Sequence, residues 1–175
     1  ILLISNNSKE TATFDFVREL MFRHNNVSFY ELNIPFNYSA INNWAVQKAR
    51  GELILLLNNE IEVISRGWLS AMVEHIQRPE VGAVGAKLLY PDYTIQHAGV
   101  LLKIKGVAGH AHRNLHDKLP GYFYRSSAIQ NFSACTAACL LLKKEVFEKV
   151  GGLEEEHLPV AFNDVDLCLK IRESG

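Results

Sequence analysis

Two groups of polar residues in the sequence could take part in catalysis. The first is Asn58-Asn59-Glu60, which directly follows the apolar run Leu53–Leu57. An acidic group after a buried strand would face the ligand crevice of a parallel α/β fold, so Glu60 and Glu62 could bind a cation. Asparagine and glutamate are also ordinary turn residues after a strand, and that structural interpretation stays open.

The second group lies where the last predicted helix begins, at Asn163, Asp164 and Asp166. As the N-cap of that helix, Asp164 would have a complete structural role worth about 1 kcal/mol. If its carboxylate instead points out of the helix into the crevice, it can accept a proton from an incoming hydroxyl group. Asp166 is expected to be a first-turn residue that the helix dipole favours.

Four histidines, His97, His110, His112 and His116, lie close together in the sequence. In an extended segment, His110 and His112 would share one face and could bind a metal ion. Neither cysteine nor a third acidic ligand accompanies them at the usual zinc spacing, which favours loop packing or hydrogen bonds to a substrate.

These residues need a scaffold, and apolar runs alternate with helical periodicity along the chain. Strands are predicted at residues 1–4, 27–32, 53–57, 81–84, 100–104 and 134–142. Helices are predicted to begin at Thr11, at Asn37 or Ser39, near Trp68, at 143–145, and at Asn163 or Asp164. This order predicts an α/β fold with three layers and a mostly parallel, mixed sheet, whose ligands bind at the carboxyl ends of the strands.

Two segments have more specific expectations. Leu53–Leu57 is too apolar to have a solvated face, so it is expected to be a central strand covered on both sides. Residues 87–129 are irregular, rich in glycine, histidine and tyrosine, and contain one predicted strand. Long loops in compact domains usually form lids or binding loops, and we expect that role for this segment.

Composition narrows the class of protein. The chain has 175 residues, of which 48% are apolar and 21% charged, as expected for one globular domain. A net charge of −1 argues against nucleic acid as a partner. Three cysteines without Cys-x-x-Cys spacing indicate buried thiols and a reducing cytoplasm. Because no apolar run approaches about 20 residues, any membrane association would be peripheral. The chain starts without methionine inside an apolar run, which predicts a fragment of a longer protein.

Five ordered blocks of the chain resemble family 2 glycosyltransferases, particularly rhamnosyl and other surface-polysaccharide transferases. They are PFNYSAINNWAVQKARGELILLLNNEIEVISRGWL, RPEVGAVGAKLLYPDYTIQHAGV, GVAGHAHR, TAACLLLKKEVFEKVGG and VAFNDVDLCLKIRESG, and together they cover nearly the whole chain. The resemblance implies the glycosyltransferase-A fold, truncated at its N-terminal strand. It also implies one domain with a nucleotide-binding half at 1–86 and an acceptor-binding or sugar-binding half at 87–175.

The resemblance further implies a role for each candidate residue. Asp164 corresponds to the general base, and Glu60 to a ligand of the Mg²⁺ or Mn²⁺ ion that bridges the diphosphate of a nucleotide sugar. Ser5 stands where the family has an aspartate that recognises the nucleobase. The residues implied to bind the donor are Ser5, Asn6, Asn42, Asn58 and Asn59. Those implied on the sugar or acceptor side are His97, His110, Asn163 and Asp166.

The implied activity is inverting transfer of a sugar from a nucleotide-sugar donor to a glycan or lipid-linked acceptor, in surface polysaccharide synthesis at the cytoplasmic face of a membrane. A second interpretation is a non-catalytic module of the same fold, structural or glycan-binding, within a multidomain protein. Ser5 and the Asn58-Asn59-Glu60 variant motivate it. A doubly wound nucleotide-binding domain of another class is disfavoured, since no Gly-x-Gly-x-x-Gly follows the first strand.

Overall fold

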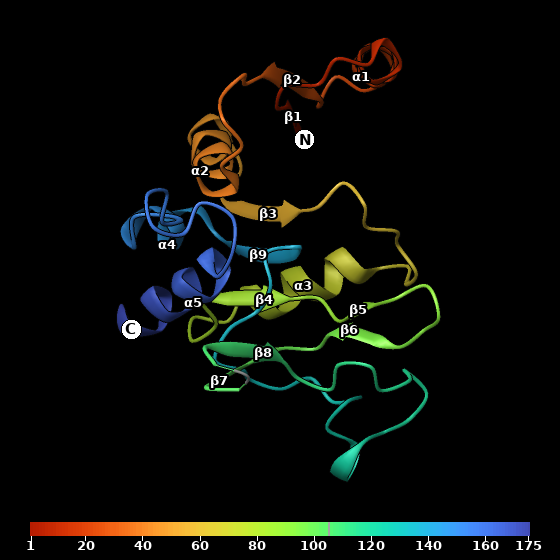
Figure 1. Cartoon of the computed structure of the whole chain (residues 1–175), viewed down its shortest axis with the longest axis vertical. Helices are drawn as coiled ribbons and strands as arrows, with labels where there is room; N and C mark the ends of the chain where they lie inside the picture. Colours follow the sequence, from red (N-terminus) through yellow and green to blue (C-terminus); the bar gives the residue numbers. More distant parts are fainter. Residues whose placement is uncertain (105) are drawn as a thin grey trace.

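The computed structural model describes residues 1–104 and 106–175 and shows an α/β fold (Figure 1). The helices are α1 (Thr11–Arg23), α2 (Tyr38–Lys48), α3 (Trp68–Ile76), η1 (Tyr122–Tyr124), α4 (Lys144–Lys149) and α5 (Asn163–Glu173). The strands are β1 (Leu2–Ser5), β2 (Ser28–Glu31), β3 (Leu53–Leu57), β4 (Ala83–Gly85), β5 (Leu88–Leu89), β6 (Ile95–His97), β7 (Val100–Leu102), β8 (Ala108–His110) and β9 (Cys139–Lys143).

The central sheet has three strands in the order β3-β9-β4. β9 is antiparallel to both neighbours, pairing Leu57 with Cys139 on one side and Gly85 with Leu140 on the other. β3 and β4 therefore run in the same direction, but both pairs of this sheet are antiparallel. The sequence predicted mostly parallel pairing, which among the described strands is found between β1 and β2. The expectation that β3 is the central strand is wrong: β9 holds that place, and Leu57 at the end of β3 is 46% exposed.

Helices cover both faces of this sheet, as the predicted three layers require (Figure 1). Alternate residues of a strand point to opposite faces, so the even-numbered and odd-numbered leucines lie on opposite faces of the sheet. The core on one face joins Leu140 and Leu142 to residues of α2, α4 and α5. The core on the other face joins Leu141 to Met72 and Ile76 of α3. The apolar run of β9 is therefore explained by burial on both sides.

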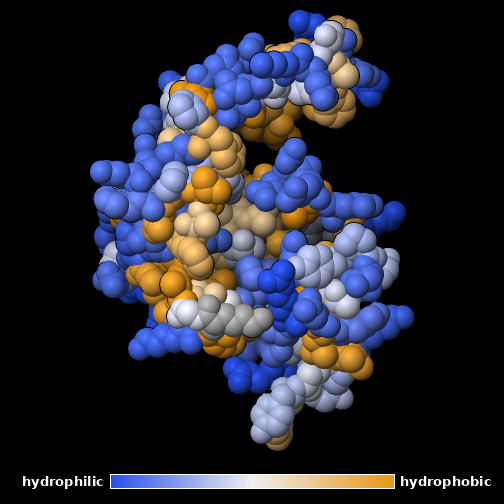
Figure 2. Space-filling model, viewed as in Figure 1, coloured by the Kyte–Doolittle hydropathy of each residue, from blue (hydrophilic) through white to orange (hydrophobic). Residues whose placement is uncertain are grey.

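The N-terminal strands form a sheet of their own. β1 and β2 pair in parallel, from Leu2 with Ser28 to Ser5 with Glu31, and α1 joins them. In the part of the chain that the structure describes, this pair shares no strand partner with the central sheet. Figure 2 shows the surface hollowed between the β1–α1–β2 unit and the rest of the molecule.

The segment 87–129 is more regular than its sequence indicates. It builds two antiparallel hairpins, β5–β6 and β7–β8, instead of the one strand expected. An isolated bridge from Val100 to Ala134 ties β7 to the residues that lead into β9. A third apolar cluster joins Val100 and Ala134 to Val165 and Cys168 of α5. The hairpins are thus fixed beside the helix that carries Asp164.

Two predicted helix starts have different outcomes. Asn37 is the N-cap of α2, and its side chain accepts a hydrogen bond from Ala40 N at 2.9 Å, which confirms that prediction. The alternative in which Asp164 or Asn163 caps α5 is wrong, because the cap is Phe162, whose backbone is left-handed with φ of 62°. Thr11 likewise begins α1 without capping it, since the N-cap is Glu10. The two predicted aspartates lie inside the first turn of α5.

Candidate active site

Asp164 holds the start of α5 against the start of β9. Its Oδ2 atom accepts a hydrogen bond from Ala137 N at 3.1 Å, and its Oδ1 atom accepts one from Val165 N at 2.8 Å. The side chain is half-buried, so the carboxylate is oriented by the backbone and still reachable from outside.

Tyr38 is a neighbour of Asp164 that sequence reasoning missed. Its hydroxyl donates to the carbonyl oxygen of Ala137 at 3.2 Å, so Tyr38 and Asp164 bind the same residue. Burial, and then the negative charge of Asp164, raise the pKa of Tyr38 to about 12. Tyr38 therefore stays protonated and acts as a donor. A tyrosine at a helix start gives no sequence signal for this role.

The Asn58-Asn59-Glu60 segment lies at the same place. Asn58 N donates to the carbonyl oxygen of Ala138 at 3.0 Å, one residue beyond the amide that binds Asp164. The end of β3 and the start of α5 therefore meet at consecutive residues before β9. The side chain of Glu60 is exposed, and its Oε1 atom lies 3.5 Å from Asn58 Nδ2.

These side chains suit a metal that arrives with its substrate. In residues 1–104 and 106–175, no group of three His, Cys, Asp or Glu side chains could hold a metal ion. Glu60 supplies one carboxylate, and Asn58 and Asn59 supply amide oxygens. Mg²⁺ is commonly held by one or two carboxylates together with substrate phosphates, so this donor set fits such an ion.

The predicted donor-binding residues nearer the N-terminus are used mainly inside the fold. Ser5 ends β1 and is only 6% exposed. The amide of Asn6 donates to Leu32 O at 2.7 Å and to Ile34 O at 3.0 Å, which ties the ends of β1 and β2 together. The amide of Asn42 donates to Tyr38 O within α2 at 2.8 Å.

The residues around Asp164 in α5 are fixed by other contacts. Asn163 is buried, and its amide donates to Ser39 Oγ at 3.0 Å and to Leu158 O at 3.3 Å. Asp166 pairs with Lys170 at 2.9 Å along the helix. Asn163 thus positions the helix start from which Asp164 projects, through a serine at the start of α2.

His97 and His110 face each other across the two hairpins, with their Nδ1 atoms 2.8 Å apart. His97 is 1% exposed, and burial, and then His110, lower its pKa to about 3. The pKa of His110 is also lowered, first by burial and then by the charge of Arg113, while Asp164 opposes the shift. His112 follows β8 with a left-handed backbone, φ of 56°, so it does not continue the extended segment with His110.

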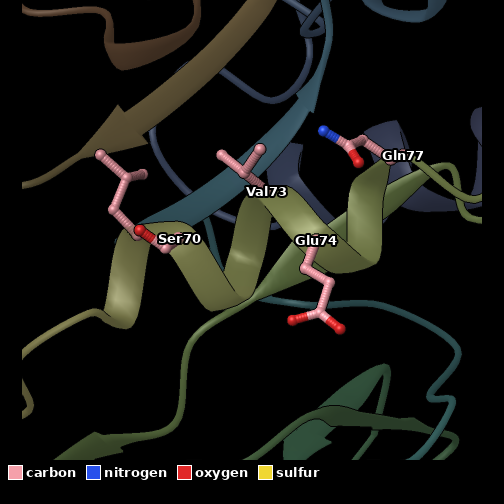
Figure 3. Close-up of a pocket in the computed structure, with 5 residues that line it drawn as sticks. Ser70, Val73, Glu74 and Gln77 are labelled. Carbon is pink, nitrogen blue, oxygen red and sulfur yellow. The ribbon is translucent and has the colours of Figure 1, made fainter.

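Two hollows of the surface lie elsewhere. One, of about 390 Å³, is lined by Leu69, Val73 and Gln77 and their neighbours on one face of α3 (Figure 3). The other, of about 700 Å³, lies beside the start of β3 and α4 and includes Arg50 and Lys144. Neither hollow includes a residue of the candidate site.

With this geometry in place, comparison with known proteins decides the family. Residues 1–151 match the family described as "Glycosyl transferase family 2". The chain belongs to this family. Family 2 membership agrees with the resemblance found in the sequence, although Asp164 lies beyond the matched range. In addition, no helix of the described residues has the length and apolar character needed to cross a membrane.

Two curated relatives are similar over the entire chain. An uncharacterized protein, y4gI, from Sinorhizobium fredii is 49% identical over 175 residues, which are 19% of its own length. The O-antigen biosynthesis protein RfbC from Myxococcus xanthus is 42% identical over 176 residues, which are 14% of its own length. The chain thus spans less than a fifth of the length of these two relatives.

One solved structure confirms the fold. The mannosyltransferase PcManGT from Pyrobaculum calidifontis, in complex with GDP-Man and Mn²⁺, matches with a TM-score of 0.68 at 18% sequence identity. The match covers 99% of this chain and 43% of that one. The predicted glycosyltransferase-A fold is therefore confirmed.

Proposed function

We propose that this chain transfers a sugar from a nucleotide-sugar donor to a hydroxyl group of a glycan or lipid-linked acceptor, with inversion, and that Asp164 is the general base. The observation that carries the proposal is the meeting of two polar segments at Ala137 and Ala138. Asp164 binds the first of these residues and Asn58 binds the second. A base and a diphosphate-binding segment at one place are what glycosyl transfer needs.

The reaction follows from the side chains in place. The Asp164 carboxylate takes the proton of the acceptor hydroxyl as its oxygen attacks the anomeric carbon. The bond from that carbon to the diphosphate oxygen breaks on the opposite face, and the nucleoside diphosphate leaves with the electron pair. Glu60, Asn58 and Asn59 would hold a Mg²⁺ or Mn²⁺ ion with the diphosphate. When bound, such an ion supplies positive charge against the leaving group.

The relatives suggest which ligands to try first. PcManGT was solved with GDP-Man and Mn²⁺, so GDP-mannose with Mn²⁺ is the first donor to test. RfbC is named for O-antigen biosynthesis, which suggests a surface polysaccharide or its lipid-linked precursor as the acceptor. His97, His110 and Asp166 stay assigned to the sugar or acceptor side, and Ser5, Asn6 and Asn42 to the donor side. A cytoplasmic location with peripheral membrane association is part of the same proposal.

Calorimetry and turnover together test this function. We expect heat of binding for a nucleotide sugar with Mn²⁺ or Mg²⁺, and transfer to a saccharide acceptor. Asp164→Asn should bind the donor normally and lose at least about 100-fold in turnover, the usual contribution of a general base. Asp15→Asn, an exposed aspartate in α1, is the matched control and should transfer like the wild type. No binding of any donor would refute the proposal.

The second candidate is the non-catalytic module. It is favoured by the lack, in the described residues, of a three-residue metal cluster and by the uncharged, buried Ser5 at the predicted nucleobase position. The same pair of variants separates the two candidates. If Asp164→Asn folds and the protein's transfer activity is unchanged, this chain is a structural or glycan-binding module.

A further inference from the structure

The two facing histidines have partners that determine where their hydrogen atoms lie. The Nε2 atom of His97 is 3.2 Å from Gly99 N and 3.3 Å from Thr136 N. Both partners are backbone amides, which can only donate a hydrogen bond. The Nε2 atom of His97 must therefore accept, and it carries no hydrogen. Since a neutral imidazole has one N–H, the hydrogen of His97 lies on Nδ1.

The hydrogen of His97 in turn fixes the hydrogen of its partner. The Nδ1 atom of His97 lies 2.8 Å from the Nδ1 atom of His110, with the two rings nearly perpendicular at 86°. Because His97 donates in this contact, His110 accepts through Nδ1 and must hold its own hydrogen on Nε2. The reverse arrangement would direct an N–H of His97 at two amide donors. Protonating His110 would likewise set two N–H groups against each other.

His110 ends β8, and its partner His97 is linked to the proposed base through the backbone. His97 accepts a hydrogen bond from Thr136 N, and Asp164 accepts one from the next amide, Ala137 N. The ring of His110 is acted on by charged groups of two other segments, Asp164 of α5 and Arg113 of the loop after β8. Arg113 is itself bound to the Tyr90 hydroxyl at 2.8 Å. His97, in contrast, is enclosed and has no surface to offer a ligand. Of the pair, only the exposed His110 can reach a ligand.

We infer that His97 is a positioning residue that holds His110 as a neutral imidazole, and that the Nε2–H group of His110 donates to a hydroxyl oxygen of a saccharide bound beside Asp164. The inference rests on the proposed function and adds a specificity residue to it. A neutral donor suits a sugar hydroxyl. An imidazolium at this place would stabilise the Asp164 carboxylate and weaken it as a base.

This arrangement also assigns different tasks to His110 and Asp164. The lone pair on Nδ1 of His110 is occupied by the hydrogen of His97, and Nε2 already carries a hydrogen. His110 therefore has no free basic nitrogen with which to take a proton from the acceptor. Proton abstraction is left to the Asp164 carboxylate, and His110 only orients the sugar.

Nitrogen NMR of the histidine rings tests the hydrogen positions directly, in the wild-type protein without ligand. At pH 7.5, long-range ¹H–¹⁵N correlation should show the Nδ1–H tautomer for His97 and the Nε2–H tautomer for His110. The opposite tautomer in either ring, or a charged His110, overturns the inference. On saturation with GDP-mannose and Mg²⁺, or with whichever nucleotide sugar gives heat of binding, together with an acceptor saccharide, the Nε2 signal of His110 should shift. The signals of the exposed His24 should not.

Substitutions supply the functional test. Removing one neutral hydrogen bond lowers binding affinity about tenfold. His110→Phe should therefore raise KM for the saccharide about tenfold. His110→Gln, which can place an amide N–H near the same position, should recover most of that loss. His24→Gln is the matched surface control, and circular dichroism checks that each variant folds. Transfer by His110→Phe at the wild-type KM overturns this inference and leaves the proposed function standing. Absence of donor binding by the wild type overturns both.

Discussion

Because His97 is buried, we predict that the folded protein loses stability in mild acid. The pKa of His97 falls from the ordinary 6.5 to about 3 in the folded protein, because burial and the neighbouring His110 disfavour the charged ring. Below pH 6.5 the unfolded chain therefore binds a proton that the folded protein excludes. The free energy of unfolding decreases as the pH is lowered from about 6.5 to about 3.

The size of this effect follows from the same two values. At pH 5, 1.5 units below the ordinary pKa of 6.5, the unfolded chain gains a factor of about 30 from protonation. That factor corresponds to about 2 kcal/mol of lost stability relative to pH 7.5. His110 adds to the loss, because its pKa is lowered as well. About 2 kcal/mol is a large part of the usual stability of a small domain.

Urea unfolding at pH 5.0 and pH 7.5, followed by the fluorescence of Trp44 and Trp68, measures the difference by linear extrapolation. His24→Gln is the control, because it removes an exposed histidine and should keep the full pH dependence. His97→Asn should lose most of it. Equal stability at the two pH values in the wild type would refute the reasoning, since a buried neutral histidine cannot be indifferent to acid.

Two further predictions concern the core and the thiols near the site. Leu142 is fully buried at the centre of the sheet, so Leu142→Ala should lower the stability of the protein by about 2–5 kcal/mol in the same urea assay. Leu57 is 46% exposed, so Leu57→Ala should lower it far less. Burial raises the pKa of Cys168 to about 12, so this thiol should resist iodoacetamide at pH 8 in the folded protein and react only after unfolding, as followed by mass spectrometry. Rapid alkylation of native Cys168 would contradict its burial.

The elements of the fold were largely predictable because burial leaves a periodic trace. The apolar run Leu53–Leu57, the alternating helices and the family 2 blocks led to the correct fold. The order of strands could not be read in the same way. β3 looked central because it is so apolar, yet β9 lies between β3 and β4, and a run of leucines does not reveal which neighbours it has. The cysteines were predicted to be buried thiols: all three are free, and Cys139 and Cys168 are buried, but Cys135 is only half-buried.

The candidate site could be predicted only in part from the sequence, for a physical reason. Glu60 follows a strand and Asp164 lies at the start of a helix, and both kinds of position can be predicted from the sequence pattern. The contact of His97 with His110 depends on how two hairpins fold, in a segment whose sequence indicated one strand. Tyr38 reaches the site through the backbone of Ala137, which no side-chain pattern records. Contacts made through a backbone or across a hairpin leave little trace in residue types.

The strand pairs of β9, and the contacts just before it, cross the boundary predicted between the two halves of the domain after residue 86. β9 belongs to the second half, but its hydrogen-bond partners on both edges are β3 and β4 of the first. Ala137, two residues before this strand, accepts from Tyr38 of the first half and donates to Asp164 of the second. We therefore predict that neither half alone can form the central sheet, because removing one half would leave the other without the strand partners of β9.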